Sequence, residues 1–174
     1  MSKLELKSFL KALKKNQLEA QIIDLYDRFK EVKVFYDFSF RPDEEKLLEE
    51  AKFKIKKEYF PDTYRRPKAR RSIAQKLIKH FQTLEVDPAV VANLMLYHVQ
   101  LGVDFNKARA GISQAAQKSF GVSFRQLVQY ARKNALYLQL LPQFTTIADR
   151  VWLENWHNAE IFSLALEGNF VAQN

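Results

Sequence analysis

The sequence contains no cysteine among its 174 residues. Disulfide bridges, zinc sites built on thiolates and cysteine nucleophiles are therefore excluded. A chain without disulfides is compatible with a cytoplasmic location, and this is the location that we expect.

Glycine and proline are also scarce, with four and five residues respectively, which argues against disorder and against a turn-rich β-sandwich. The glycines are isolated from one another, so the sequence has no glycine-rich phosphate loop and no Gly-x-Ser-x-Gly nucleophile turn. No paired acidic residues fall in a segment that looks sheltered. We therefore expect a protein that is not an enzyme and needs no cofactor.

Long apolar runs are missing as well. The most apolar window, residues 89–101, is too short to cross a membrane and is interrupted by Asn93 and His98. The first residues have no long apolar stretch and no small-residue cleavage site, so we expect neither a membrane span nor a signal peptide.

The residues that are present are those of a folded globular protein. Apolar residues make up 47% of the chain and charged residues 28%, and fourteen Phe and seven Tyr supply large side chains for burial. A chain of this length can bury a sizeable core. We therefore expect a single domain over residues 1–174.

Helix start signals and apolar stripes recur along the chain. Ser2 followed by Glu5 is a capping box, and Asn16 repeats the signal, so the first two helices are expected to form a hairpin. Pro42 and Pro67 suit first helical positions. The pattern predicts an all-α fold of seven or eight antiparallel helices, packed either as a compact bundle or as an irregular array.

In the second half of the chain, prolines and glycines are the expected helix boundaries. One helix is predicted from Asp87 to near Gly102, one over 106–120 that stops at Gly121, and one over 123–141, before Pro142. The last is predicted to run from near Thr146 to Glu167.

Two stretches also show the alternation typical of a strand. For residues 34–40 we expect a short extended or irregular connector, with a small hairpin as the alternative. For residues 51–55 the helical period extends further in both directions, so a helix is favoured.

Positive charge is concentrated between Lys52 and Lys79. This basic segment, residues 52–79, holds eleven Lys and Arg against two acids, although the whole chain has a net charge of only +8. A concentrated positive surface attracts polyanions, of which nucleic acid is the commonest. Projection of the helix after Pro67 places Arg70 on the apolar side, where we expect it to pair with an acid.

The candidate anion-binding residues share one loop and the polar face of the following helix. They are Tyr64, Arg65, Arg66, Lys68, Arg71, Lys76 and Lys79. The Arg side chains would bind phosphates, and Tyr64 would stack on a base. The alternative is that acids at residues 43–50 neutralise the cluster internally, and both interpretations stay open.

A second function from a different class is a protein–protein interaction scaffold built on the aromatic C-terminal helices. Trp152 and Trp156 are spaced to share a helix face, with Phe162 nearby. Packing in the core explains the same pattern. Nucleic acid, another polyanion and a protein partner are thus all open as ligands, and so is the oligomeric state.

A metal site is not expected. Glu154 and His157 have the Glu-x-x-His spacing of di-iron bundles, but such sites need a second motif, and neither His80 nor His98 supplies it. His98 follows apolar residues and is expected to be a half-buried core histidine.

Three segments, residues 1–10, 24–33 and 68–81, resemble a family of small bacterial helical proteins of unknown function. The likeness is best in the first half of the chain, and after Gly102 only residues 156–158 share it. The resemblance implies a bacterial, cytoplasmic, helical protein. It implies no activity, cofactor or catalytic residue.

Overall fold

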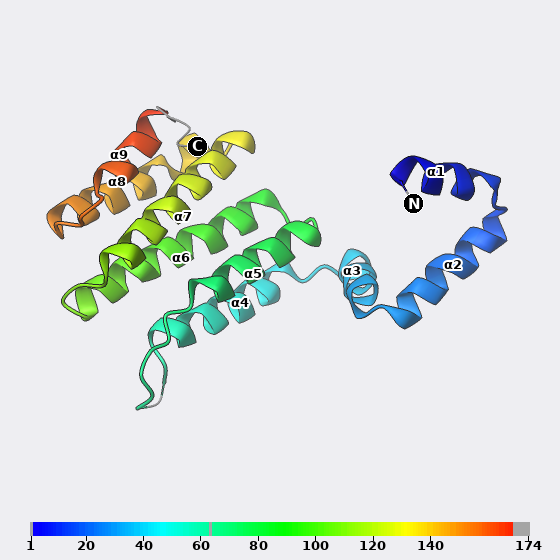
Figure 1. Cartoon of the computed structure of the whole chain (residues 1–174), viewed down its shortest axis with the longest axis horizontal. Coiled ribbons are helices and arrows are strands. Elements are labelled where there is room, and N and C mark those ends of the chain that lie inside the picture. The colour runs from blue at the N-terminus through cyan, green and yellow to red at the C-terminus, as the bar shows by residue number, and fades with distance from the viewer. Residues whose placement is uncertain (1, 63, 169–174) are drawn as a thin grey trace. The chain divides into compact units, whose positions relative to one another are not determined.

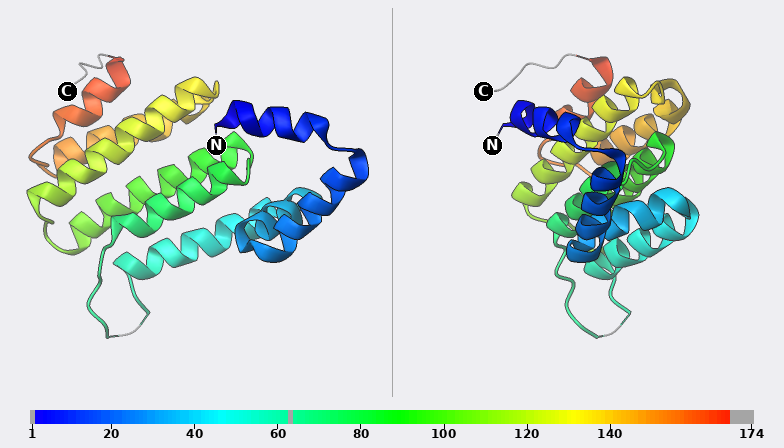
Figure 2. Two further views of the ribbon diagram at one scale, coloured as in Figure 1. Left: turned by 45° about the vertical axis from the view of Figure 1, so that its right-hand side comes forward. Right: turned by 90° about the vertical axis from the view of Figure 1, so that its right-hand side faces the viewer.

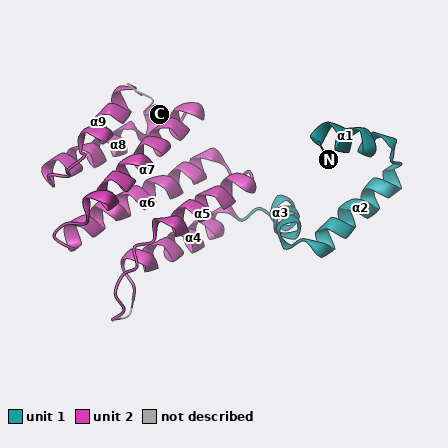
Figure 3. Cartoon of the chain, in the orientation of Figure 1, with its two compact units in different colours: residues 1–43 teal, residues 44–174 magenta. Residues whose placement is uncertain are grey.

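The computed structural model describes residues 2–62 and 64–168. Within them the chain forms nine α-helices and no strand, which confirms the predicted all-α class with more helices than the seven or eight expected. The chain divides into two compact units, residues 1–43 and 44–174 (Figure 3). We describe each unit by itself, and the single domain over residues 1–174 stays a prediction.

Unit 1 contains α1 (Lys3–Ala12), α2 (Lys15–Arg28) and α3 (Lys30–Phe40). The predicted capping box is confirmed, because the Ser2 hydroxyl accepts from the Glu5 backbone N–H and the Glu5 carboxylate accepts from that of Ser2. The expected hairpin of the first two helices is wrong: α2 packs against α3 instead. The Tyr26 hydroxyl donates to Asp37 at 2.7 Å across that pair.

The extended connector expected at residues 34–40 is also wrong, because these residues form most of α3. Tyr36 and Phe40 lie one turn apart with stacked rings 6.1 Å apart, and the Ser39 hydroxyl donates to the Phe35 carbonyl at 2.8 Å. The alternation was ambiguous because five of the seven residues are apolar, including Phe35 outside the alternating set, and such a run suits either period. None of the described residues of unit 1 is buried.

Unit 2 contains the other six helices, which lie side by side (Figures 1 and 2). They are α4 (Glu44–Tyr59), α5 (Arg71–Thr83), α6 (Pro88–Ala108), α7 (Gln114–Lys133), α8 (Tyr137–Leu153) and α9 (Glu160–Glu167). Helix α6 packs against α4, α5, α7 and α8. The helix favoured at residues 51–55 is confirmed, because these residues lie within α4.

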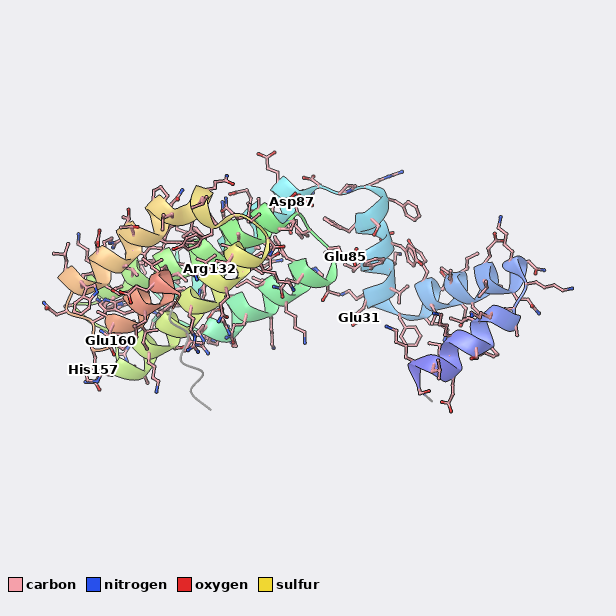
Figure 4. The ribbon with its side chains drawn as sticks, turned by 90° about the horizontal axis from the view of Figure 1, so that it is seen from above. Glu31, Glu85, Asp87, Arg132, His157 and Glu160 are labelled. Atoms are coloured by element: carbon pink, nitrogen blue, oxygen red, sulfur yellow. The ribbon has the colours of Figure 1, made fainter. Side chains whose placement is uncertain are left out.

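Helix α6 is the centre of the core because it is apolar on most of its circumference. Asp87 caps its start by accepting from the Ala89 N–H at 2.7 Å, and Pro88 occupies the first turn, as predicted. Figure 4 labels Glu85 and Asp87 in the short connection that leads into it. Val91, Val99 and Val103 are fully buried along the helix.

Two of the predicted helix ends lie inside helices. Gly102 is within α6, where an added Cβ would lie 2.2 Å from the Phe120 ring of α7. Gly121 is within α7, where a Cβ would meet Asn158 and Ile161 at 3.0 and 3.2 Å. These glycines therefore allow close helix packing and do not end helices.

The real connections fall elsewhere. Residues 109–113 and 134–136 link the helices, and Ala110, Gly111 and Ala135 have positive φ angles of 51°, 113° and 58°. Pro142 lies inside α8, near its start, where it removes a single intrahelical hydrogen bond. Thr146 is in the middle of the same helix.

None of the described helices is both long and apolar enough to span a membrane.

Candidate nucleic-acid interface

The connection between α4 and α5 projects beyond the ends of the two helices (Figures 1 and 2). We call residues 61–70, apart from residue 63, the basic bend. Helix α5 begins at Arg71, so the prediction that Pro67 opens this helix is wrong. The bend is closed at its base, where the Ala69 N–H donates to the Glu58 carbonyl at 2.8 Å. Ala69 has a φ of 47°, an uncommon conformation for alanine that turns the chain into α5.

The same Glu58 also holds the bend through its side chain. Its two carboxylate oxygens accept from Nε and Nη2 of Arg70, each at 2.8 Å, in a bidentate pair. This hydrogen bond lowers the pKa of Glu58, against the opposing effect of burial. The Glu58 side chain is 13% exposed and that of Arg70 is 52% exposed. The expected pairing of Arg70 with an acid is thus confirmed.

Charged side chains line an open hollow of about 320 Å³ on one side of the bend, which we call the charged hollow. Its lining residues are Lys57, Glu58, Pro61, Asp62, Arg65, Arg66, Lys68 and Arg70. Arg65, Arg66 and Lys68 are exposed, and within the described part of the chain they form no side-chain hydrogen bond or ion pair. Since Arg70 engages Glu58, Asp62 is the remaining carboxylate of this lining.

The acids at the start of α4 have partners of their own. Glu44 accepts from the Asp87 N–H at 2.9 Å, Glu49 pairs with Lys52 at 3.2 Å and Glu50 pairs with Lys54 at 4.0 Å. Along α4, Glu44 lies about 22 Å from Tyr59 at the end of the helix, and Glu49 and Glu50 lie about 14 to 15 Å from it. These three acids therefore do not neutralise the bend.

The other predicted cations lie outside the charged hollow. Arg71 is half-buried, and its Nη1 donates to the Ser119 carbonyl of α7 at 2.8 Å. Lys76 and Lys79 are exposed on α5, and Lys79 lines a different hollow, of about 540 Å³, with Lys133 and Tyr130. The structure thus brings Arg65, Arg66 and Lys68 together and separates Arg71, Lys76 and Lys79 from them.

A second open hollow, of about 340 Å³, lies against the bend, and we call it the aromatic hollow. Its lining residues are Tyr59, Phe60, Pro61, Tyr64, Arg65, Pro67, Ala108 and Arg109. The Tyr64 side chain is fully exposed, and its ring contacts no other ring of the described residues. The two hollows share Arg65 and Pro61.

Sequence reasoning missed Arg109 and Phe60 as members of this site. Arg109 follows the end of α6 and reaches the bend only because α6 packs beside α4. Its guanidinium lies 5.6 Å from the centre of the Phe105 ring, a cation–π distance. No local pattern around Arg109 indicates this placement. Phe60 lies between Tyr59 and Pro61 in the sequence, and this aromatic–proline run could have indicated that Phe60 belongs to the site.

Beneath the bend, Tyr59 and His98 are each only 1% exposed, and their ring centres are 6.1 Å apart. The Tyr59 hydroxyl and both His98 nitrogens have no hydrogen-bond partner among the described residues. Burial raises the pKa of Tyr59. Burial first, and then the nearby Arg71 charge, lowers the pKa of His98 to about 4. His98 is therefore a fully buried neutral residue and not the half-buried one expected.

The three aromatic residues of the alternative partner site are placed very differently. Trp156 and Phe162 are 4% and 0% exposed, with rings 5.8 Å apart in the core. Trp152 is 54% exposed, and its indole N–H donates to the Ser163 hydroxyl at 2.8 Å. The shared helix face predicted for the two tryptophans is wrong, because α8 ends at Leu153.

Glu154 is a hydrogen-bonding centre. Its carboxylate accepts from Asn106 at 2.9 Å, from the Trp156 indole N–H at 3.2 Å and from Arg150 at 3.5 Å. His157, labelled in Figure 4, is exposed. In residues 2–62 and 64–168, no three His, Asp or Glu side chains are grouped as metal ligands.

The fold and this site define an all-α protein with an exposed basic bend between two helices. Residues 1–170 match the family of unknown function DUF6155, so the chain belongs to that family. The resemblance to a family of unknown function is thereby confirmed, and it extends well beyond the first half of the chain. No curated protein and no solved structure matches the chain.

Proposed function

We propose that this protein binds nucleic acid or another polyanion at the basic bend, without catalysing a reaction. The observation that carries the proposal is the exposure of Arg65, Arg66 and Lys68 in one hollow, with no ion pair to any described residue. The five cations of this hollow outnumber its two acids, so the cations repel one another, and a phosphate would relieve that repulsion. The cytoplasm, where nucleic acids are found, is the proposed location.

The arrangement around these cations supports phosphate binding. Arginine offers a planar fork of donors that matches phosphate oxygens, and lysine adds a point charge. The Ala69 backbone bond to Glu58 holds the base of the bend in place.

The test is binding of labelled mixed-sequence DNA and RNA by fluorescence anisotropy, from about 50 to about 200 mM salt. The triple variant Arg65→Ala, Arg66→Ala and Lys68→Ala removes three cations that would contact phosphates. The slope of log K against log salt should therefore become less steep by roughly 2 to 3. Affinity at the lower salt should fall at least tenfold.

A matched control removes the same charge from unit 1 through Lys3→Ala, Lys7→Ala and Lys11→Ala. This triple variant should keep most of the wild-type affinity and slope. Equal losses in the two triple variants, or no binding by the wild type at the lower salt, would refute the proposal.

A protein-interaction role is the second candidate, and exposed Trp152 and Leu153 at the end of α8 favour it, at 54% and 81% exposure. Light scattering over a range of concentrations is the test. Self-association that Trp152→Ser with Leu153→Ser abolishes would support this role. If the protein is a monomer at every concentration, it does not self-associate through this surface.

A further inference from the structure

The two hollows beside the basic bend differ in chemistry. The charged hollow is lined by five cations, two acids and a proline, whereas the aromatic hollow is lined mainly by rings and prolines. Arg65 lines both. A ligand that fills both must carry negative charge next to a flat apolar group.

Tyr64 is the most exposed large hydrophobic side chain of the described residues. An unpacked aromatic ring in water gains free energy when another flat ring covers it. Phe60 and Tyr59 form the inner wall of the same hollow and are fixed by packing, since the Phe60 ring lies 5.8 Å from that of Phe105. The hollow thus combines a packed aromatic wall with an exposed ring.

Single-stranded nucleic acid has the required chemistry, because its phosphates alternate with bases whose faces are open to stacking. In a duplex the base faces are covered by neighbouring bases, so Tyr64 would have nothing to stack on. A free phosphate or an aliphatic polyanion would use the charged hollow alone.

We propose that the ligand of the basic bend is a single strand, with one base in the aromatic hollow and the adjoining phosphates in the charged hollow. Arg65 contacts a phosphate at the boundary of the two hollows, and Tyr64 stacks on the base. This inference rests on the proposed function and adds to it the class of nucleic acid.

The experiment compares four probes on the full chain at about 50 mM salt: a single strand of roughly 12 nucleotides as DNA and as RNA, its duplex, and the same DNA strand without bases. The single strand with bases should bind about tenfold more tightly than the abasic strand and the duplex. Tighter binding of either the DNA strand or the RNA strand supports the proposal, because both strands present a base that can stack on Tyr64.

Variants at Tyr64 isolate the stacking contact. Tyr64→Ala should weaken binding of the strand with bases about tenfold and leave the abasic strand unaffected, whereas Tyr64→Phe should bind as the wild type does. Trp152→Ala is the matched control, because it removes an exposed aromatic residue that lines neither hollow and should change neither affinity. Since Tyr64 is fully exposed, its replacement leaves the core intact.

The possible failures are distinguishable. Equal binding of normal and abasic strands, or tighter binding of the duplex, would overturn the single-strand inference and leave polyanion binding at the bend intact. No binding of any probe would overturn both.

Discussion

The core around α6 and the basic bend are opposites within one unit. In the core, side chains such as Val99 and Phe124 are fully buried, and contacts with other helices fix their positions. In the bend, Arg65 and Arg66 are exposed and have no partner among the described residues. Five residues further along the chain, Arg70 donates to the Glu58 carboxylate and Arg71 donates to the Ser119 carbonyl. Arginines of one short segment thus divide into a pair that stabilises the fold and a pair available to a ligand.

The largest expected effect lies in the core. Gly102→Ala should lower the free energy of unfolding by about 3 kcal/mol, because the new Cβ would overlap the buried Phe120 ring, and this outweighs the gain of roughly 1 kcal/mol in helix propensity. Urea denaturation measures the change. In a Phe120→Leu background the cost should be smaller, and an unchanged cost would show that the two residues are not coupled.

The next effect is a dependence on pH. Since the pKa of His98 falls from 6.5 to about 4 on folding, the unfolded chain takes up a proton below pH 6.5 that the folded chain does not. Stability should therefore decrease as the pH falls, by about 2 kcal/mol at about pH 5. Urea denaturation at about pH 7.5 and about pH 5 should show this loss in the wild type.

His98→Leu should remove most of that pH dependence, while His157→Gln, a change of an exposed histidine, should retain it. An undiminished pH dependence in the His98 variant would mean that other groups cause it.

A smaller effect separates the two kinds of arginine. Arg71→Met should cost about 1.5 kcal/mol, because it leaves the half-buried Ser119 carbonyl without its charged donor. Arg66→Met should change stability by less than about 0.5 kcal/mol, as exposed substitutions do, yet weaken binding of a polyanion. Thermal denaturation and anisotropy of both variants check this contrast. Similar stability losses would contradict the division of the arginines.

The smallest effect concerns the acid of the bend. Glu58→Gln removes a negative charge from the charged hollow and releases Arg70, so polyanion affinity should rise about threefold. Stability should fall by less than about 1 kcal/mol, since Arg70 is half exposed. Glu50→Gln is the matched control on α4, away from the hollow. An increase of equal size there would show that only total charge matters.

The sequence by itself determined the helical class and the features that depend on neighbouring residues. The capping box at Ser2 and the cap at Asp87 were predictable because a cap bonds to N–H groups two or three positions away. The concentration of cations in residues 52–79 was equally plain, and so was the pairing of Arg70 with an acid, though not which acid.

Only the tertiary structure decided the contacts between residues far apart in the chain. Gly102 and Gly121 serve close packing inside helices, because α7 approaches Gly102, and Asn158 with Ile161 of α9 approaches Gly121; no local pattern records an approach of that kind. The same is true of Arg71, which donates to a carbonyl 48 positions away, and of Arg109, which reaches the bend from α6. Helix formation and capping are local, whereas close packing and charge pairing depend on which helices become neighbours.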